Sequence, residues 1–176
     1  MTKRNIELKA RLESLDAARE TARQLATGSL GIERQTDTYF VCRFGRLKLR
    51  QREGLPDQLV WYARANHAAP KPSDYYLVEV ADAAALRAAL TAALGVLAVV
   101  DKRREIFLVD NVRIHLDQVS DLGDFLEFEA VLGPDDGDDE GRTQLADLSR
   151  MFGIDARSLV AGSYSDLLLE RRPPGG

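Results

Sequence analysis

Residues 45–53 read Gly-Arg-Leu-Lys-Leu-Arg-Gln-Arg-Glu, a regular alternation of cationic and apolar side chains. Successive side chains of a β-strand point to opposite faces of the sheet. One face of this segment therefore carries four cations: Arg46, Lys48, Arg50 and Arg52. The other face carries Leu47 and Leu49. The pattern predicts a strand with one apolar face and one strongly basic face.

The same alternation recurs along the chain and predicts a protein built mainly of strands. Strands are expected at residues 4–12, 32–43, 45–53, 57–66, 74–80, 96–109, 111–119 and 123–131. Helices are expected from Ser14 to about Ala26, after Asp82, at about 142–152 after an acidic loop at 133–141, and briefly after Asp155. About eight strands in near-consecutive antiparallel order favour an α+β fold, an eight-stranded antiparallel β-barrel with helices packed outside.

Length and composition narrow the class of protein. The chain has 176 residues, of which 45% are hydrophobic and 30% charged, and its formal net charge is −4. These values suit one domain, expected over residues 1–170, followed by a disordered tail at 171–176. A net negative charge argues against general nucleic-acid binding. Cys42 is the only cysteine in the sequence, which excludes intrachain disulfides and thiolate-cage zinc sites.

The sequence also predicts where the protein resides. No apolar run approaches the ~20 residues that span a bilayer. Residues 1–5 lead straight into charged positions, without the apolar segment of a secretory signal. We therefore expect a cytoplasmic protein that does not bind membranes.

The polar faces of the predicted strands separate the two signs of charge. Lys102 and Arg104 alternate on one strand, whereas Glu7, Glu127 and Glu129 lie on others. For any single strand, the ordinary interpretation is a solvated outer face. Solvated faces usually mix signs, however, and a barrel interior with separate cationic and acidic walls would be costly without a ligand.

A chain of phosphates with a divalent cation would satisfy both walls. Arginine and lysine bind phosphoryl oxygens, and carboxylates hold Mg²⁺ or Mn²⁺. The sequence contains neither G-x-x-x-x-G-K-[ST] nor G-x-G-x-x-G, so a glycine-rich phosphate loop is not expected. Side chains inside the barrel would then provide the charge neutralisation that phosphoryl chemistry needs.

The strands together resemble the CYTH superfamily, also called triphosphate tunnel metalloenzymes. The family hallmark is an E-x-E-x-K strand, and residues 5–9 read Asn-Ile-Glu-Leu-Lys, with Asn5 in place of the first Glu. Similar motifs follow at residues 47–50, 102–104, 113–117, 122–129 and 163–168. The segments 37–40 and 73–76 are most similar to the class IV adenylyl cyclase-like branch. The His-Phe pair that precedes the hallmark in some cyclases is missing.

The resemblance implies a barrel tunnel that binds a triphosphate compound with Mg²⁺ or Mn²⁺. The implied substrates are ATP, thiamine triphosphate or tripolyphosphate. ATP would be cyclised to cyclic AMP and pyrophosphate, or a triphosphate would be hydrolysed. Asn5 offers a neutral oxygen where the enzymes have a metal carboxylate, which leaves open a non-catalytic nucleotide- or polyphosphate-binding module. An oligonucleotide-binding barrel and a homodimer also stay open.

The candidate site residues fall into three groups. The phosphate-binding candidates are Lys48, Arg50, Arg64, Lys102, Arg104 and Arg113. The metal candidates are Glu7, Asp117, Glu127 and Glu129. Lys9 and His115 are the catalytic candidates. Lys9 would contact phosphate or orient the metal carboxylates; His115 would touch the ligand or transfer a proton, unless it is a barrel histidine satisfied by Asp117.

Overall fold

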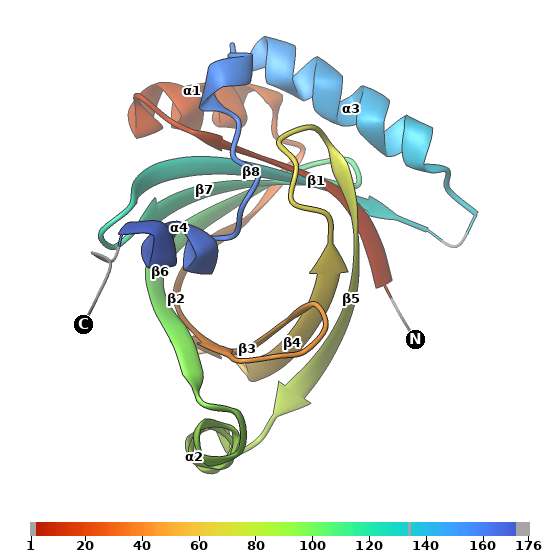
Figure 1. Cartoon of the computed structure of the whole chain (residues 1–176). Coiled ribbons are helices and arrows are strands. Elements are labelled where there is room, and N and C mark those ends of the chain that lie inside the picture. Colours follow the sequence, from red (N-terminus) through yellow and green to blue (C-terminus); the bar gives the residue numbers. More distant parts are fainter. Residues whose placement is uncertain (1–2, 134, 172–176) are drawn as a thin grey trace.

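The computed structural model describes residues 3–133 and 135–171, and within them it confirms the α+β barrel. Eight strands close on themselves around a ring (Figure 1). The strands are β1 (Lys3–Arg11), β2 (Gly28–Phe40), β3 (Arg46–Arg52), β4 (Asp57–Arg64), β5 (Lys71–Val80), β6 (Val96–Val109), β7 (Val112–Val119) and β8 (Gly123–Leu132). The expected disordered tail lies outside the described residues except for residue 171, which ends a helix.

The barrel is antiparallel throughout, in the order β1-β5-β4-β3-β2-β6-β7-β8. Most neighbours are consecutive hairpins. Three pairings join distant segments: β2 pairs with β6, and β1 pairs with both β5 and β8. The first strand in chain order therefore closes the ring. It places Glu7 opposite Glu129, and Lys9 opposite Glu127.

The described residues form four α-helices; the first three cover the outer surface of the barrel, as the sequence predicts, whereas the last begins at Tyr164, which contacts the inward-facing Asp117. They are α1 (Leu15–Leu25), α2 (Ala83–Leu94), α3 (Asp138–Met151) and α4 (Tyr164–Arg171), with a short 3₁₀ helix at Ala156–Ser158. Ser14 caps α1 and Asp82 caps α2 through side-chain oxygens that accept backbone N–H bonds. Figure 1 shows α1 and α3 together on one side of the ring and α2 on the opposite side. None of the helices within the described residues is long and apolar enough to cross a bilayer.

The main apolar core lies between the barrel and its helices. Ile6, Leu8, Ile114 and Phe128 point outward from β1, β7 and β8, and they pack with Leu145 of α3 and with α1. Since strand side chains alternate, the charged residues between these positions point inward. The barrel is thus apolar outside, beneath the helices, and charged inside. This inversion of the usual arrangement is the property on which the site depends.

Three element boundaries differ from the sequence prediction. β2 begins at Gly28, before the expected residue 32, because a register shift at Ser29–Gly31, with Gly31 at φ 82°, interrupts the alternation. β5 begins at Lys71 and includes Pro72, because its pairing with β4 stops at Ser73 and the missing N–H is not needed there. α3 begins at Asp138, so the second half of the expected acidic loop forms its first turn, where carboxylates favour the helix dipole.

Candidate functional site

A cavity of about 180 Å³ lies inside the barrel and is lined mainly by polar and charged side chains. Its walls come from all eight strands and from the start of α4. Ten of the twelve predicted site residues line it, and His115 and Asp117 do not: the ten are Glu7, Lys9, Lys48, Arg50, Arg64, Lys102, Arg104, Arg113, Glu127 and Glu129.

 Arg113 is the lining residue that β7 contributes. Its side chain is 44% exposed, so it lies at the edge of the cavity. The predicted convergence of distant cations and carboxylates inside one barrel is therefore present.

The cationic half of the cavity is organised around Asp37 of β2. One carboxylate oxygen accepts a hydrogen bond from Arg50 Nε at 2.8 Å. The other accepts bonds from Arg50 Nη2 at 2.9 Å, Lys48 Nζ at 2.9 Å and Lys102 Nζ at 2.6 Å. Asp37 is fully buried and does not line the cavity, whereas its three partners do. A single carboxylate thus holds three phosphate candidates from β3 and β6 in place.

Burial and mutual repulsion change the acidity of this cluster. Burial opposes ionisation of Asp37, but Arg50, Lys102 and Lys48 outweigh it and hold the pKa of Asp37 well below its usual range. Burial, together with repulsion from Arg50, lowers the pKa of Lys48 to about 8. Burial lowers the pKa of Lys102 to about 7, against the attraction of Asp37. The cluster therefore carries an excess of positive charge that a bound anion would stabilise.

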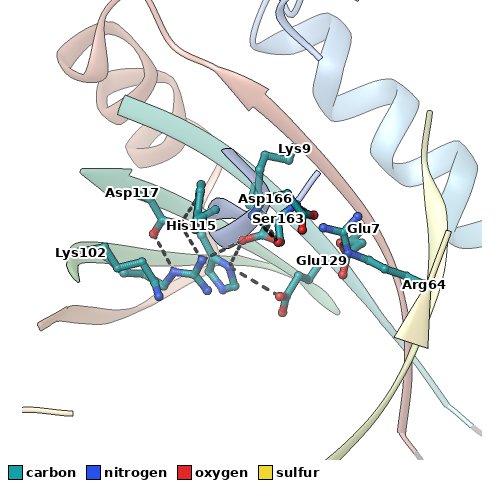
Figure 2. Close-up of polar contacts among 12 residues, drawn as sticks. Glu7, Lys9, Arg64, Lys102, His115, Asp117, Glu129, Ser163 and Asp166 are labelled. Carbon is teal, nitrogen blue, oxygen red and sulfur yellow. Dashed lines mark hydrogen bonds and ion pairs between the residues drawn. The ribbon is translucent and has the colours of Figure 1, made fainter. Parts of the chain in front are cut away.

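The acidic half of the cavity comes from β1, β7 and β8, and each carboxylate there has a different environment (Figure 2). Glu7 Oε1 forms an ion pair with Arg64 Nε at 2.9 Å. Glu127 lies 2.8 Å from Arg104 Nη2 and 3.5 Å from Lys9 Nζ. These pairs mean that the two signs of charge are interleaved around the bore, which corrects the prediction of fully separate walls.

The same contacts divide the two carboxylates electrostatically. Burial raises the pKa of Glu7, and the nearby charge of Glu127 raises it further, against the attraction of Arg64. Burial also disfavours the charged form of Glu127, but Lys9, His115 and Arg104 outweigh it, so its pKa is well below the ordinary value. Glu127 is therefore the carboxylate that the protein itself keeps ionised.

His115, Glu127 and Glu129 form the cluster that best suits a divalent cation. Each offers one ligand atom, and these atoms lie within 4.8 Å of one another. Nδ1 of His115 lies 3.9 Å from an oxygen of each glutamate (Figure 2). Asn5 lines the same cavity, and its buried Oδ1 finds no hydrogen-bond partner among the described residues. This donor set fits an octahedral or related divalent ion completed by phosphate or water oxygens.

Asp117 has a different environment from the other metal candidates. Its carboxylate accepts two bonds from Arg104, at 2.7 and 2.6 Å, and one from the hydroxyl of Tyr164 at 2.6 Å. It is completely buried and is not among the residues that line the cavity. Arg104 nevertheless outweighs the effect of burial and lowers the pKa of Asp117. Asp117 therefore fixes the guanidinium of Arg104, which itself lines the cavity.

Three further residues at the site were not among the sequence candidates. Asp37 was noted only as part of a family-like segment, although its alternation with Gln35 and Tyr39 places it on the inner face. Lys71 lies between Pro70 and Pro72, which predict a loop, so the sequence does not indicate it as a site residue. It is 1% exposed, and burial with repulsion from Arg64 lowers its pKa to about 8. Tyr164 lines the cavity from α4, with Lys9 Nζ 3.8 Å from its ring centroid.

Three other cations of these strands, Arg46, Arg52 and Arg103, lie away from the inner cavity. Arg46 pairs with Asp166 at 2.7 Å. Arg52 and Arg103 line a larger and more open hollow of about 840 Å³ at another part of the barrel. Lys102 borders both spaces, and Asp37 binds its ammonium group. The Asp37 cluster therefore lies at the boundary between the two spaces.

A closed antiparallel barrel with cations and carboxylates in its bore defines a class of protein that binds anionic ligands through side chains. A family model for the CYTH domain matches residues 3–164. The chain therefore belongs to the CYTH domain family. This confirms the resemblance drawn from the sequence.

Comparisons with solved structures agree with the fold. The PH1012 protein of Pyrococcus horikoshii is 25% identical, with a TM-score of 0.82 over 93% of this chain and 98% of that one. A Vibrio parahaemolyticus protein named as an adenylate cyclase candidate is 20% identical, with a TM-score of 0.76 over 94% and 97%. HpAC1 from Hippeastrum, named as an adenylyl cyclase candidate with a dominant triphosphatase activity, is 15% identical, with a TM-score of 0.65 over 97% and 98%. The last two show the fold alone. No curated protein sequence matches the chain.

Proposed function

We propose that the protein is a metal-dependent enzyme that cleaves or cyclises a triphosphate compound inside the barrel. The observation that supports this most directly is the meeting of two groups in one cavity: the cations bound to Asp37, and the carboxylates Glu127 and Glu129, which His115 adjoins. Membership of the CYTH family supports triphosphate chemistry as the general class of activity.

The phosphate chain would lie along the cationic half of the cavity. Lys48, Arg50 and Lys102 would bind it there, and their shared contact with Asp37 holds them in position before the ligand arrives. Arg104 is held in the same way by Asp117. Preorganised donors of this kind stabilise charge that develops on a leaving group without reorganising during the reaction. Arg64 and Arg113 would bind the chain nearer the acidic half.

Glu7, Glu127 and Glu129 would hold the cation, with Asn5 as a neutral neighbour. When bound, Mg²⁺ or Mn²⁺ would neutralise phosphoryl charge and polarise the phosphorus. Lys9 lies between Glu127 and Tyr164, so we assign it the positioning of that carboxylate. His115 lies against Glu127 and Glu129 and belongs to this end of the cavity.

Two nucleophiles are compatible with this arrangement. Attack by water would give orthophosphate and a diphosphate. Attack by the ribose 3′-hydroxyl of ATP would give cyclic AMP and pyrophosphate. In both cases the bond broken is a phosphoanhydride bond. The cationic side chains named above would stabilise the negative charge on the leaving group.

A non-catalytic nucleotide- or polyphosphate-binding module is the second candidate. Two features of β1 favour it: Asn5 supplies no charge, and Glu7 is already engaged by Arg64 at 2.9 Å. Binding through the Asp37 cluster would survive a weak cation site, whereas turnover would not.

One experiment separates these functions. Purified protein is incubated with ATP, thiamine triphosphate or tripolyphosphate, each with Mg²⁺, with Mn²⁺ or with chelator, and products are resolved by chromatography. Cyclic AMP identifies a cyclase, and orthophosphate identifies a triphosphatase. Calorimetric binding of tripolyphosphate with no product in any reaction identifies the binding module. The absence of both product and binding would refute the proposal.

A further inference from the structure

We propose that the imidazole of His115 is a direct metal ligand, so that the site prefers a first-row transition ion such as Mn²⁺ over Mg²⁺. The inference rests on the proposed function, because it concerns the same cation site. It goes further by naming a nitrogen donor and the class of metal that such a donor selects.

The first argument is the position of His115 in the sheet. His115 pairs in register with Glu127 across β7 and β8, and Glu127 is followed at the next inward position by Glu129. Nδ1 of His115 lies 3.9 Å from Oε2 of Glu127 and 3.9 Å from Oε1 of Glu129. These separations are too long for hydrogen bonds. They leave room for an ion among the three residues, since one ligand atom from each lies within 4.8 Å of the others.

The second argument is an unmet hydrogen-bonding requirement. The His115 residue is 3% exposed, and its Nδ1 has no hydrogen-bond partner among the described residues. A buried polar atom without a partner destabilises the folded protein. An ion between Nδ1 and the two glutamates would satisfy this atom. A purely structural histidine would be expected to form a hydrogen bond at this nitrogen.

The third argument is the chemistry of the donor set. Mg²⁺ favours oxygen ligands in a strict octahedral geometry, whereas an imidazole nitrogen stabilises transition ions. The β1 side of the cavity offers the neutral Asn5, whose Oδ1 is also buried without a partner. One nitrogen and two carboxylates form a mixed set that Mn²⁺ accepts better than Mg²⁺ does.

The test measures ligation directly rather than activity. Mn²⁺ is titrated into the purified full chain, and pulsed electron paramagnetic resonance detects ¹⁴N coupling from a coordinated nitrogen. The measurement is repeated on protein labelled with ¹⁵N-histidine and on His115→Leu, with His67→Gln as the matched control at an exposed histidine. Mg²⁺ and Mn²⁺ affinities are compared by calorimetry.

The expected result is a ¹⁴N coupling that changes to ¹⁵N on labelling, persists in His67→Gln and disappears in His115→Leu. We expect His115→Leu to weaken Mn²⁺ binding by at least about tenfold and Mg²⁺ binding by less, because loss of a direct ligand exceeds the usual cost of an outer-shell change. If His115→Leu does not fold, ¹⁵N-histidine-labelled His67→Gln keeps the test decisive, because His115 is then the one histidine left in the sequence.

Other outcomes overturn the inference. Bound Mn²⁺ without histidine coupling would show that His115 is not a ligand, and would leave the proposed function intact. Equal affinities for Mg²⁺ and Mn²⁺ would overturn the stated preference. If neither ion binds, with or without tripolyphosphate, both the inference and the metal-dependent function fail.

Discussion

The two halves of the cavity differ in how closely their buried charges are paired. In the cationic half, Lys48, Arg50 and Lys102 share one carboxylate, and every bond to it is 2.9 Å or shorter. In the acidic half, Glu129 meets Arg113 and His115 only at 3.8 and 3.9 Å. The first half is tightly bonded before any ligand is present. The second has groups spaced for an additional partner.

This difference indicates a division of labour between stability and ligand selection. Asp37 has no contact with the cavity and stabilises the groups that do. The loose geometry around Glu129 leaves donor capacity for an ion. Loss of the Asp37 carboxylate should therefore affect folding and phosphate binding together, whereas loss of the Glu129 carboxylate should affect metal binding with little effect on folding.

The largest expected effect follows removal of the Asp37 carboxylate. Asp37→Ala leaves three buried cations without their shared anion, and breaking a buried ion pair costs about 3–5 kcal/mol. We expect the free energy of unfolding to fall by about that amount in urea denaturation. Glu129→Ala is the control from the other half and should cost less than about 1 kcal/mol, because its ion pairs are long and its side chain is partly exposed. Equal losses in the two variants would remove the contrast.

The second prediction concerns phosphate affinity. Arg50→Ala removes a buried guanidinium from the cavity, and a hydrogen bond to a charged group contributes about 1.5–3 kcal/mol. We therefore expect tripolyphosphate to bind about 10- to 100-fold more weakly in calorimetry. Arg113→Ala, at the exposed edge, should change the affinity by only about threefold. Wild-type affinity in Arg50→Ala, in a protein with a native circular dichroism spectrum, would place Arg50 outside the binding site.

The third prediction sharpens the acidic half. Asn5→Glu adds a carboxylate to the β1 side of the cavity, and the number of charged ligands tunes the affinity for divalent cations. We expect about tenfold tighter Mn²⁺ binding in calorimetric titration, with unchanged affinity for tripolyphosphate in the absence of metal. Unchanged Mn²⁺ titration curves would show that Asn5 is not part of the cation site.

The smallest expected effect is a pH dependence of the cationic half. Lys102 has a pKa of about 7 in the folded protein, so its charge is lost as the pH rises through 7. If phosphate binds the charged form, metal-free affinity should fall about fivefold between pH 7 and 8. Lys102→Arg, which stays charged, should lose the part of this dependence that comes from residue 102 and keep the weaker part that comes from Lys48, whose pKa is about 8. A pH-independent affinity in the wild type would exclude Lys102 from the contact.

The same lysine affects stability with the opposite sign. Between about pH 7 and 10.5 the unfolded chain binds a proton at this lysine that the folded protein does not. The contribution of Lys102 to the free energy of unfolding therefore rises with pH across this window. Binding and stability should diverge over the same range.

The sequence was sufficient to predict the barrel because the inward and outward faces of its strands differ so strongly. The alternation in residues 45–53 needs no knowledge of partners to be recognised. The Asp37 cluster could not be predicted in this way, since it depends on the register of β2 against both β3 and β6. Lys71 escaped notice because Pro70 and Pro72 suggest a loop, and only the pairing of β1 with β5 makes that segment a strand.

The closing role of β1 has a consequence for how the protein is made. Glu7 and Lys9 belong to the first strand, yet their partners Glu129 and Glu127 lie on the last. On the ribosome, β1 can pair with β5 earlier, but its pairing with β8 must wait until that strand has been synthesised. Pairing over so long a separation carries an entropic cost and slows folding. The acidic half of the cavity is thus assembled only when the ring closes, and a nascent chain that stops before β8 would have neither a barrel nor a cation site.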